Sequence, residues 1–181
     1  MEALPQAEHS LKAILDGDTY GDASAFMHLL AEGNILTMFR FSEFISPTPV
    51  DKRIFQLVMQ DEARHVSYGM QHLKWTSDHT PERKEQLHSA LDEGESITIN
   101  QFDAALTECM IVLAGKGTRP AQIAEGVKIV GDMQVKQMQE YFHRLRRAGF
   151  EDRIARSKFT PMLSQLGLTP EFTSKAAAEV S

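Results

Sequence analysis

The chain has 181 residues, 42% of them hydrophobic, and a net charge of −6. This length fits one domain with a sizeable core, and a single short basic run at 144–147 argues against a nucleic-acid-binding protein. The lone cysteine, Cys109, excludes an intramolecular disulfide. Because no stretch of about 18 apolar residues and no secretory signal are found, we expect a cytoplasmic protein that does not enter the membrane.

Nearly every segment of the chain is predicted to be helical. We expect Asp22 to cap a first long helix, a bend near Gly94 in the third segment, and a possible interruption near Gly131 in the last long helix. The short loops between long helices favour antiparallel neighbours and a bundle. The expected helical segments cover about 23–45, 50–76, 81 to about 95, then to about 114, and 121–147, followed by a short helix and tail in 151–181.

Three carboxylates lie within helix faces that are otherwise apolar. Glu32, Glu62 and Glu108 each have apolar residues three and four positions away, which share the same helix face. An unpaired buried carboxylate is costly, so each must be protonated, paired or bound to a metal. Three such cases in one small domain favour a shared cation.

Two Glu-x-x-His motifs strengthen this prediction, at Glu62–His65 and at Glu140–His143. A pair of metal ions in a four-helix bundle takes one Glu from each of two helices and Glu-x-x-His from each of the other two. The spacing is 30 residues from Glu32 to Glu62 and 32 from Glu108 to Glu140. The predicted metal ligands are Glu32, Glu62, His65, Glu108, Glu140 and His143.

Other interpretations of these residues stay open. Glu62 and His65 also fit a buried ion pair across one helical turn. Glu140 and His143, beside Lys136 and Arg144, also fit a solvent-exposed helix face. Glu93 matches the height of the other ligands better than Glu108 if the third helix is unbroken, although its helix face is polar.

The strings QDEARHVSYG and LLAEGNILTMF make residues 22–147 similar to the ferritin-like di-iron carboxylate superfamily, and especially to the first Glu-x-x-His helix of bacterial multicomponent monooxygenases. This resemblance implies an all-α fold: a ferritin-like four-helix bundle with a crossover between two helical hairpins, plus short terminal helices. A single domain would span 1–181, with its core in about 22–150. The crossover favours Glu108 over Glu93 as a ligand.

The same resemblance implies an oxidase or oxygenase that uses O₂ to oxidise a small organic molecule. Two iron ions would be bound, with manganese possible at one site, and an external ferredoxin or reductase would supply electrons. Glu62 and Glu108 would act as catalytic ligands. Asp61 would accept a hydrogen bond from His143, and Gln139 would be the partner of His65. We also expect a homodimer.

Gly69 lies one turn beyond His65 on the same face, where its missing side chain would leave room for oxygen or substrate. The surrounding face residues would line a pocket or pack as ordinary core: Ala25, His28, Leu29, Leu36, Phe39 and Ala104. Two other functional classes remain, namely an iron-handling or peroxide-reducing ferritin-like protein, and a non-catalytic helical scaffold.

Overall fold

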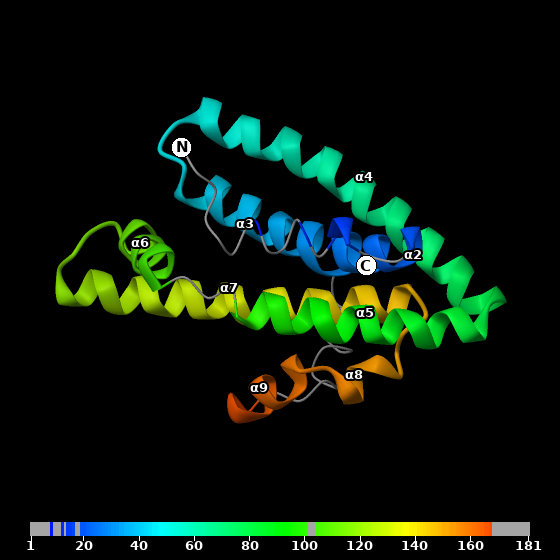
Figure 1. Cartoon of the computed structure of the whole chain (residues 1–181). Helices are drawn as coiled ribbons and strands as arrows, with labels where there is room; N and C mark the ends of the chain where they lie inside the picture. Colours follow the sequence, from blue (N-terminus) through cyan, green and yellow to red (C-terminus); the bar gives the residue numbers. More distant parts are fainter. Residues whose placement is uncertain (1–7, 9–11, 13, 17–18, 101–103, 168–181) are drawn as a thin grey trace.

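The computed structural model describes residues 19–100 and 104–167, together with residues 8, 12 and 14–16 near the N-terminus (Figure 1). Within these residues the secondary structure is entirely helical, which confirms the all-α prediction. The long elements are joined by short loops. In order, the elements are α2 (Tyr20–Ser24), the π-helix η1 (Ala25–Ala31), α3 (Glu32–Ile45), α4 (Pro49–His79), α5 (Pro81–Asn100), α6 (Ala104–Ala114), α7 (Pro120–Arg147), α8 (Arg153–Arg156) and α9 (Phe159–Gln165).

Local chemistry explains where these helices begin. Thr48 precedes α4, and its hydroxyl accepts a hydrogen bond from the amide of Asp51 at 3.2 Å, while Pro49 occupies the first turn. The first helix begins three residues earlier than predicted. Its cap is Thr19, whose hydroxyl accepts from the amide of Asp22 at 3.3 Å, so the prediction that Asp22 caps this helix is wrong.

Two glycines that were expected to disturb helices do not. Helix α5 continues through Gly94, and α7 continues through Gly131. At Gly94 a β-carbon would overlap with the ring of Phe26, so this glycine allows close packing rather than a bend. The change of direction comes later, because the axes of α5 and α6 differ by 67° on either side of residues 101–103.

The helices pack differently at the two ends of the molecule. At one end, η1, α4, α5 and the C-terminal half of α7 surround a common core (Figure 1). At the other end, α3 packs against α4 and α7, and α6 packs against α7, but α4 and α6 do not form a packed pair. Two helical hairpins are therefore joined through α3 and α7. The finer prediction, a ferritin-like bundle with a crossover, stays a prediction.

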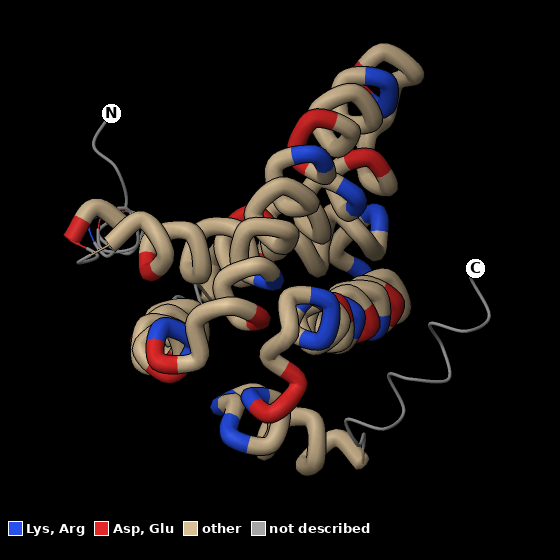
Figure 2. Tube along the Cα trace, turned by 90° about the vertical axis from the view of Figure 1, so that its right-hand side faces the viewer, with Lys and Arg blue, Asp and Glu red and all other residues tan. Residues whose placement is uncertain are grey.

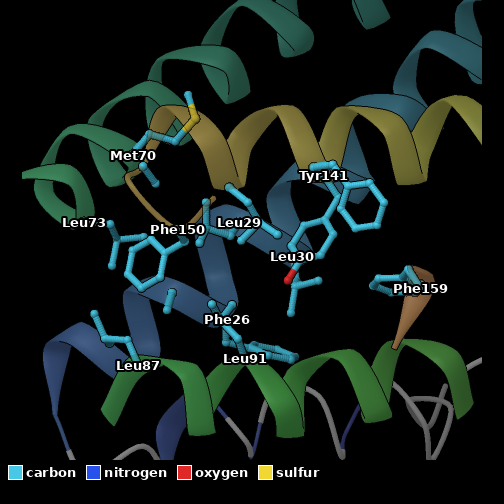
Figure 3. Packing of buried hydrophobic residues seen from close by; sticks show 14 of the residues in the cluster. Phe26, Leu29, Leu30, Met70, Leu73, Leu87, Leu91, Tyr141, Phe150 and Phe159 are labelled. Atoms are coloured by element: carbon cyan, nitrogen blue, oxygen red, sulfur yellow. The ribbon is translucent and has the colours of Figure 1, made fainter. Parts of the chain in front are cut away.

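The larger core lies at the first end and is mostly aliphatic and aromatic (Figure 3). Leu29 and Leu30 of η1 face Leu91 of α5 and Tyr141 of α7 in this cluster, and all four are almost fully buried. A smaller cluster at the second end is built on Phe41, Met110, Ala114 and Val130. Burial of these side chains is what stabilises the helices, since short isolated helices are marginal in water.

A buried ionic cluster fastens α8 to α5. Arg153 and Glu95 are both fully buried, and their side chains form an ion pair at 3.0 Å. Arg153 also donates to Asp92 at 2.9 Å, and the Tyr141 hydroxyl donates to Glu95 at 2.7 Å. Burial, followed by the charge of Glu95, raises the pKa of Tyr141 well above its usual value. The hydroxyl therefore remains a proton donor.

The surface has a mixed charge pattern. Figure 2 shows acidic and basic residues interspersed along the helices in that view. Among the described residues, no single helix combines the length and the apolar character needed to cross a bilayer, and only the bent pair α5 and α6 passes that test jointly.

Candidate functional site

The first predicted ligand, Glu32, lies at the point where the π-helix η1 gives way to α3. A π-helix has wider turns than an α-helix and is often found at functional sites. One turn earlier, His28 is buried, and the Oε2 atom of Glu32 accepts a hydrogen bond from Nδ1 of His28 at 2.5 Å. The structure thus gives Glu32 an imidazole partner on its own helix.

The position of His28 depends on Gly69 of α4. A β-carbon at Gly69 would overlap with the β-carbon and ring carbons of His28, so the imidazole lies directly against the α4 backbone. The prediction that Gly69 leaves open space for oxygen or substrate is therefore wrong, because His28 fills that space. The same contact brings η1 and α4 close together.

Glu62 faces the α3 side of α4 and is mostly buried. Desolvation raises the pKa of Glu62, and the negative charge of Glu32 raises it further, while His65 and His28 lower it. The Nδ1 atom of His65 lies 3.6 Å from the Oε2 atom of Glu62. We call the four residues His28, Glu32, Glu62 and His65 the α3–α4 seam. Two carboxylates from different helices are electrostatically coupled there.

The second Glu-x-x-His motif has different neighbours. Glu140 of α7 accepts hydrogen bonds from Arg40 at 2.5 Å and from the Thr37 hydroxyl at 3.3 Å, both on α3. His143 is largely exposed, and desolvation together with Arg147, Arg146 and Arg144 lowers its pKa. Glu140 is therefore held in an ion pair with Arg40. This arrangement is close to the alternative in which Glu140 and His143 belong to a solvent-exposed helix face.

Arg144 is buried between α7 and the η1–α3 segment. Its Nε atom donates to the carbonyl oxygen of Leu29 at 2.9 Å, and Gly33 leaves room for its guanidinium group. Within the described part of the chain, Nη2 has no hydrogen-bond partner. Burial lowers the pKa of Arg144 to about 10, although the charge of Glu140 opposes this shift.

The other predicted residues lie outside the seam. Glu108 is exposed on α6, and Glu93 is exposed on α5. Asp61 pairs with Arg64, its neighbour on α4, instead of accepting from His143. Gln139 is partly buried on α7, and among the described residues it makes no hydrogen bond to His65. The expected contacts that orient the two histidines are therefore not formed.

The six predicted ligands can be compared with the positions that the structure gives them. Among the described residues, no three His, Cys, Asp or Glu side chains are grouped so that they hold a metal ion together. The six predicted ligands do not form one cluster, because Glu108 is exposed and Glu140 is paired with Arg40. What the structure brings together is two pairs, His28 with Glu32 and His65 with Glu62, and the charge of Glu32 also acts on Glu62.

The expected pocket is mostly filled with side chains. Ala25 and Leu29 are fully buried in the core, as plain packing requires, and Ala104 is exposed on α6. A shallow groove of about 330 Å³ lies elsewhere, between α3 and α7, and is lined by residues that include Phe41, Phe44 and Met133. No local sequence pattern indicates this groove, because it joins residues about 90 positions apart.

The chain was compared with protein-family models, with curated proteins and with solved structures, and none of them matches it.

Proposed function

We propose that the α3–α4 seam is a binding site for a divalent transition-metal ion, and that the chain is a metal-dependent oxidoreductase. The observation that supports this best is that Glu32 of α3 and Glu62 of α4 are both largely buried carboxylates of like charge, and that burial, followed by the charge of Glu32, raises the pKa of Glu62. A cation between two carboxylates relieves their repulsion. Each carboxylate also has an imidazole next to it, from His28 and from His65.

The donor set indicates the class of metal. Carboxylate oxygens combined with imidazole nitrogens suit iron and manganese, whereas thiolates are absent from the seam. His65 is exposed, so its side chain is able to rotate toward a cation without repacking the core. His28 is packed against Gly69 and holds Glu32 in place through Nδ1. We therefore assign Glu32, Glu62 and His65 as ligands and His28 as the group that positions Glu32.

The resemblance of residues 22–147 to di-iron carboxylate proteins supplies the proposed reaction, which is the oxidation of a small organic substrate by O₂ with electrons from an external donor. Bound iron would supply the reducing electrons to O₂. Glu62 contributes a carboxyl group that keeps its proton to a higher pH than an ordinary glutamate, because burial and Glu32 raise its pKa. Metal binding at the seam should therefore weaken as the pH falls and Glu62 becomes protonated.

Anaerobic titration with Fe(II), followed by calorimetry and metal analysis, tests this proposal. Replacing Glu32 or Glu62 by Gln, or His65 by Ala, should weaken binding by at least about tenfold. The matched controls are Glu108→Gln and Glu140→Gln, which should leave the affinity unchanged. Binding that ignores the seam variants, or no binding at all, contradicts the proposal. If all five variants lose Fe(II) affinity equally and the unmodified chain binds two ions, the site predicted from the sequence, with six ligands, would replace the proposed one.

A non-catalytic helical scaffold is the second candidate, and one observation favours it. Glu140, a predicted ligand, is neutralised by Arg40 instead of facing the seam. A scaffold would bind no Fe(II) under anaerobic conditions. An iron-handling protein would bind iron but would show no substrate-dependent consumption of O₂, and gel filtration would separate a large cage from a small assembly.

A further inference from the structure

Helix α6 is apolar on nearly all sides but is only partly covered. Nine of its eleven residues are Ala, Leu, Cys, Met, Ile or Val, and only Met110 and Ala114 are buried. Ala105, Cys109 and Leu113 are exposed, and Leu113 retains 50% of its accessible surface. Their spacing of four residues places them on one face of the helix. A helix that is apolar on all sides is normally buried. The exposure of this outer face therefore means that nothing in the described chain covers it.

Close backbone contacts fix α6 on α7 and keep its outer face turned away. A β-carbon at Gly115 would overlap with the carbonyl oxygen of Gln122, and one at Gly126 with the carbonyl oxygen of Ile111. The two helices therefore approach closely at Gly126 of α7 and at Gly115, which directly follows α6. Met110 and Ala114 complete the contact in the smaller core. Because α6 is fixed in this way, it does not reach α4 of its own chain.

Helix α4 has a matching uncovered face at the same end of the molecule. Val50 and Ile54 retain 68% and 52% of their accessible surface, and Leu57 and Val58 are also exposed. These residues recur at intervals of three and four, so they form one stripe along the helix. Helix α3 packs on the opposite side of α4, and α6 does not cover the stripe. A soluble surface rarely concentrates large apolar side chains in this way without a binding partner.

We propose that α6 of one chain packs on the Val50–Val58 stripe of α4 in a second copy, and that the reciprocal contact completes a two-fold symmetric dimer. One chain offers both surfaces, which is the requirement for an isologous pair. Eleven residues of α6 span about 16 Å, and the nine residues 50–58 of α4 span about 13 Å, so the stripe extends along most of the length of α6. Within the described chain α4 and α6 do not form a packed pair, so the proposed contact would cover both surfaces at once.

The charges at the edges of the two stripes agree with this pairing. Glu108 is the only charged residue of α6, and it lies beside the exposed face. Arg53 lies beside the α4 stripe, between Val50 and Ile54, and is exposed. A contact between α6 and α4 thus brings an acid on one chain near a base on the other, and complementary charges favour one orientation of docking. This inference does not depend on metal binding at the seam.

Sedimentation velocity on the full chain tests the dimer directly. We expect twice the mass of the chain, and a dissociation constant that rises about tenfold or more in Leu113→Asp and in Ile54→Asp. Both sites are about half-exposed in the single chain, so the variants should keep their helical circular dichroism. Met162→Asp, at an exposed position on α9, is the matched control and should leave the dimer intact. A monomer at every concentration overturns the proposal.

The lone cysteine allows the contact itself to be mapped. With Ile54→Cys, oxidation should link the new thiol to Cys109 of a second copy and give a covalent dimer on a non-reducing gel. Glu125→Cys, on an exposed part of α7, should give no such increase over the unmodified chain. A disulfide formed within one chain would overturn the proposal, because it would mean that α6 covers α4 of its own chain.

A charge exchange gives a third, independent readout. Glu108→Arg alone and Arg53→Glu alone should each weaken the dimer several-fold, and the double variant should recover most of the loss. Losses that simply add in the double variant would show that these two residues do not meet, and would overturn the proposed orientation.

Discussion

The imidazole of His28 occupies the space that a side chain at Gly69 would need. Replacing Gly69 by Ala should therefore push His28 away from α4 or separate η1 from α4. Such overpacking costs about 1–3 kcal/mol of unfolding free energy. Urea unfolding followed by circular dichroism measures this loss, and His28→Ala in the same background should recover part of it by removing the overlap.

Gly131 of α7 provides the comparison, because among the described residues, apart from its own helix backbone, no atom lies within 4 Å of a β-carbon built there. Gly131→Ala should stabilise the protein by about 0.5–1 kcal/mol, since alanine favours a helix interior over glycine. A loss of stability at Gly131 as large as that at Gly69 would mean that the contact with His28 is not the cause.

Two arginines of α8 should differ sharply in their effect on stability. Arg153→Met leaves the carboxylate of Glu95 buried without its cation, and breaking a buried pair in this way costs about 3–5 kcal/mol. Arg156→Met removes only an exposed pair with Glu85, which is worth at most about 1 kcal/mol. Chemical denaturation of both variants measures the difference, and equal losses would contradict the proposed role of the buried cluster.

The buried imidazole of His88 should make stability depend on pH. Its Nε2 lies 3.0 Å from Asp152, its Nδ1 has no partner among the described residues, and desolvation lowers its pKa below 6.5. The unfolded chain therefore binds a proton at a higher pH than the folded chain. This contribution to stability is complete above about pH 6.5 and is lost as the pH falls from there toward the folded pKa, with a slope of at most about 1.4 kcal/mol per pH unit.

The pH dependence needs a variant for comparison, because the lowered pKa of His143 acts in the same direction. Unfolding free energies of the unmodified protein and of His88→Gln, measured between about pH 5 and 8, isolate the part due to His88. We expect a shallower slope in His88→Gln below about pH 6.5. If the two plots of unfolding free energy against pH run parallel, His88 has the same pKa in the folded and the unfolded chain, which would contradict this prediction.

The positions of the long helices followed from sequence because periodic apolar residues, prolines and cap residues act locally. The expected bounds 50–76 and 121–147 lie within α4 and α7. Glycine was harder to interpret, since its role depends on what approaches it. Gly94 and Gly69 look like flexible or open positions in the sequence, but Phe26 and His28 pack against them.

Within the candidate site, spacing in the sequence predicted that Glu32 and Glu62 lie near one another, but it did not predict their distant neighbours. Glu32, Glu62 and His65 were placed together by spacing within one hairpin, whose geometry is set by a short loop. The environment of Glu140 is set by its ion pair with Arg40, which lies 100 residues away in the sequence. No periodic pattern in the sequence links these two residues. The position of Glu108 depends on the direction of α6 relative to α5, and the residues that join these helices, 101–103, lie outside the described residues.

The π-helix η1 makes the length of residues 25–31 matter as much as their composition. Its wider turns contain about one residue more than α-helical turns, and each residue rotates an α-helix by 100°. If all seven residues relaxed into ordinary α-helix, Thr19–Ser24 would rotate about the helix axis, whereas the loss of one residue together with that relaxation would leave their direction nearly unchanged. Shortening the chain by one residue should therefore be tolerated better here than within α3, where it would rotate everything before the deletion by about 100°.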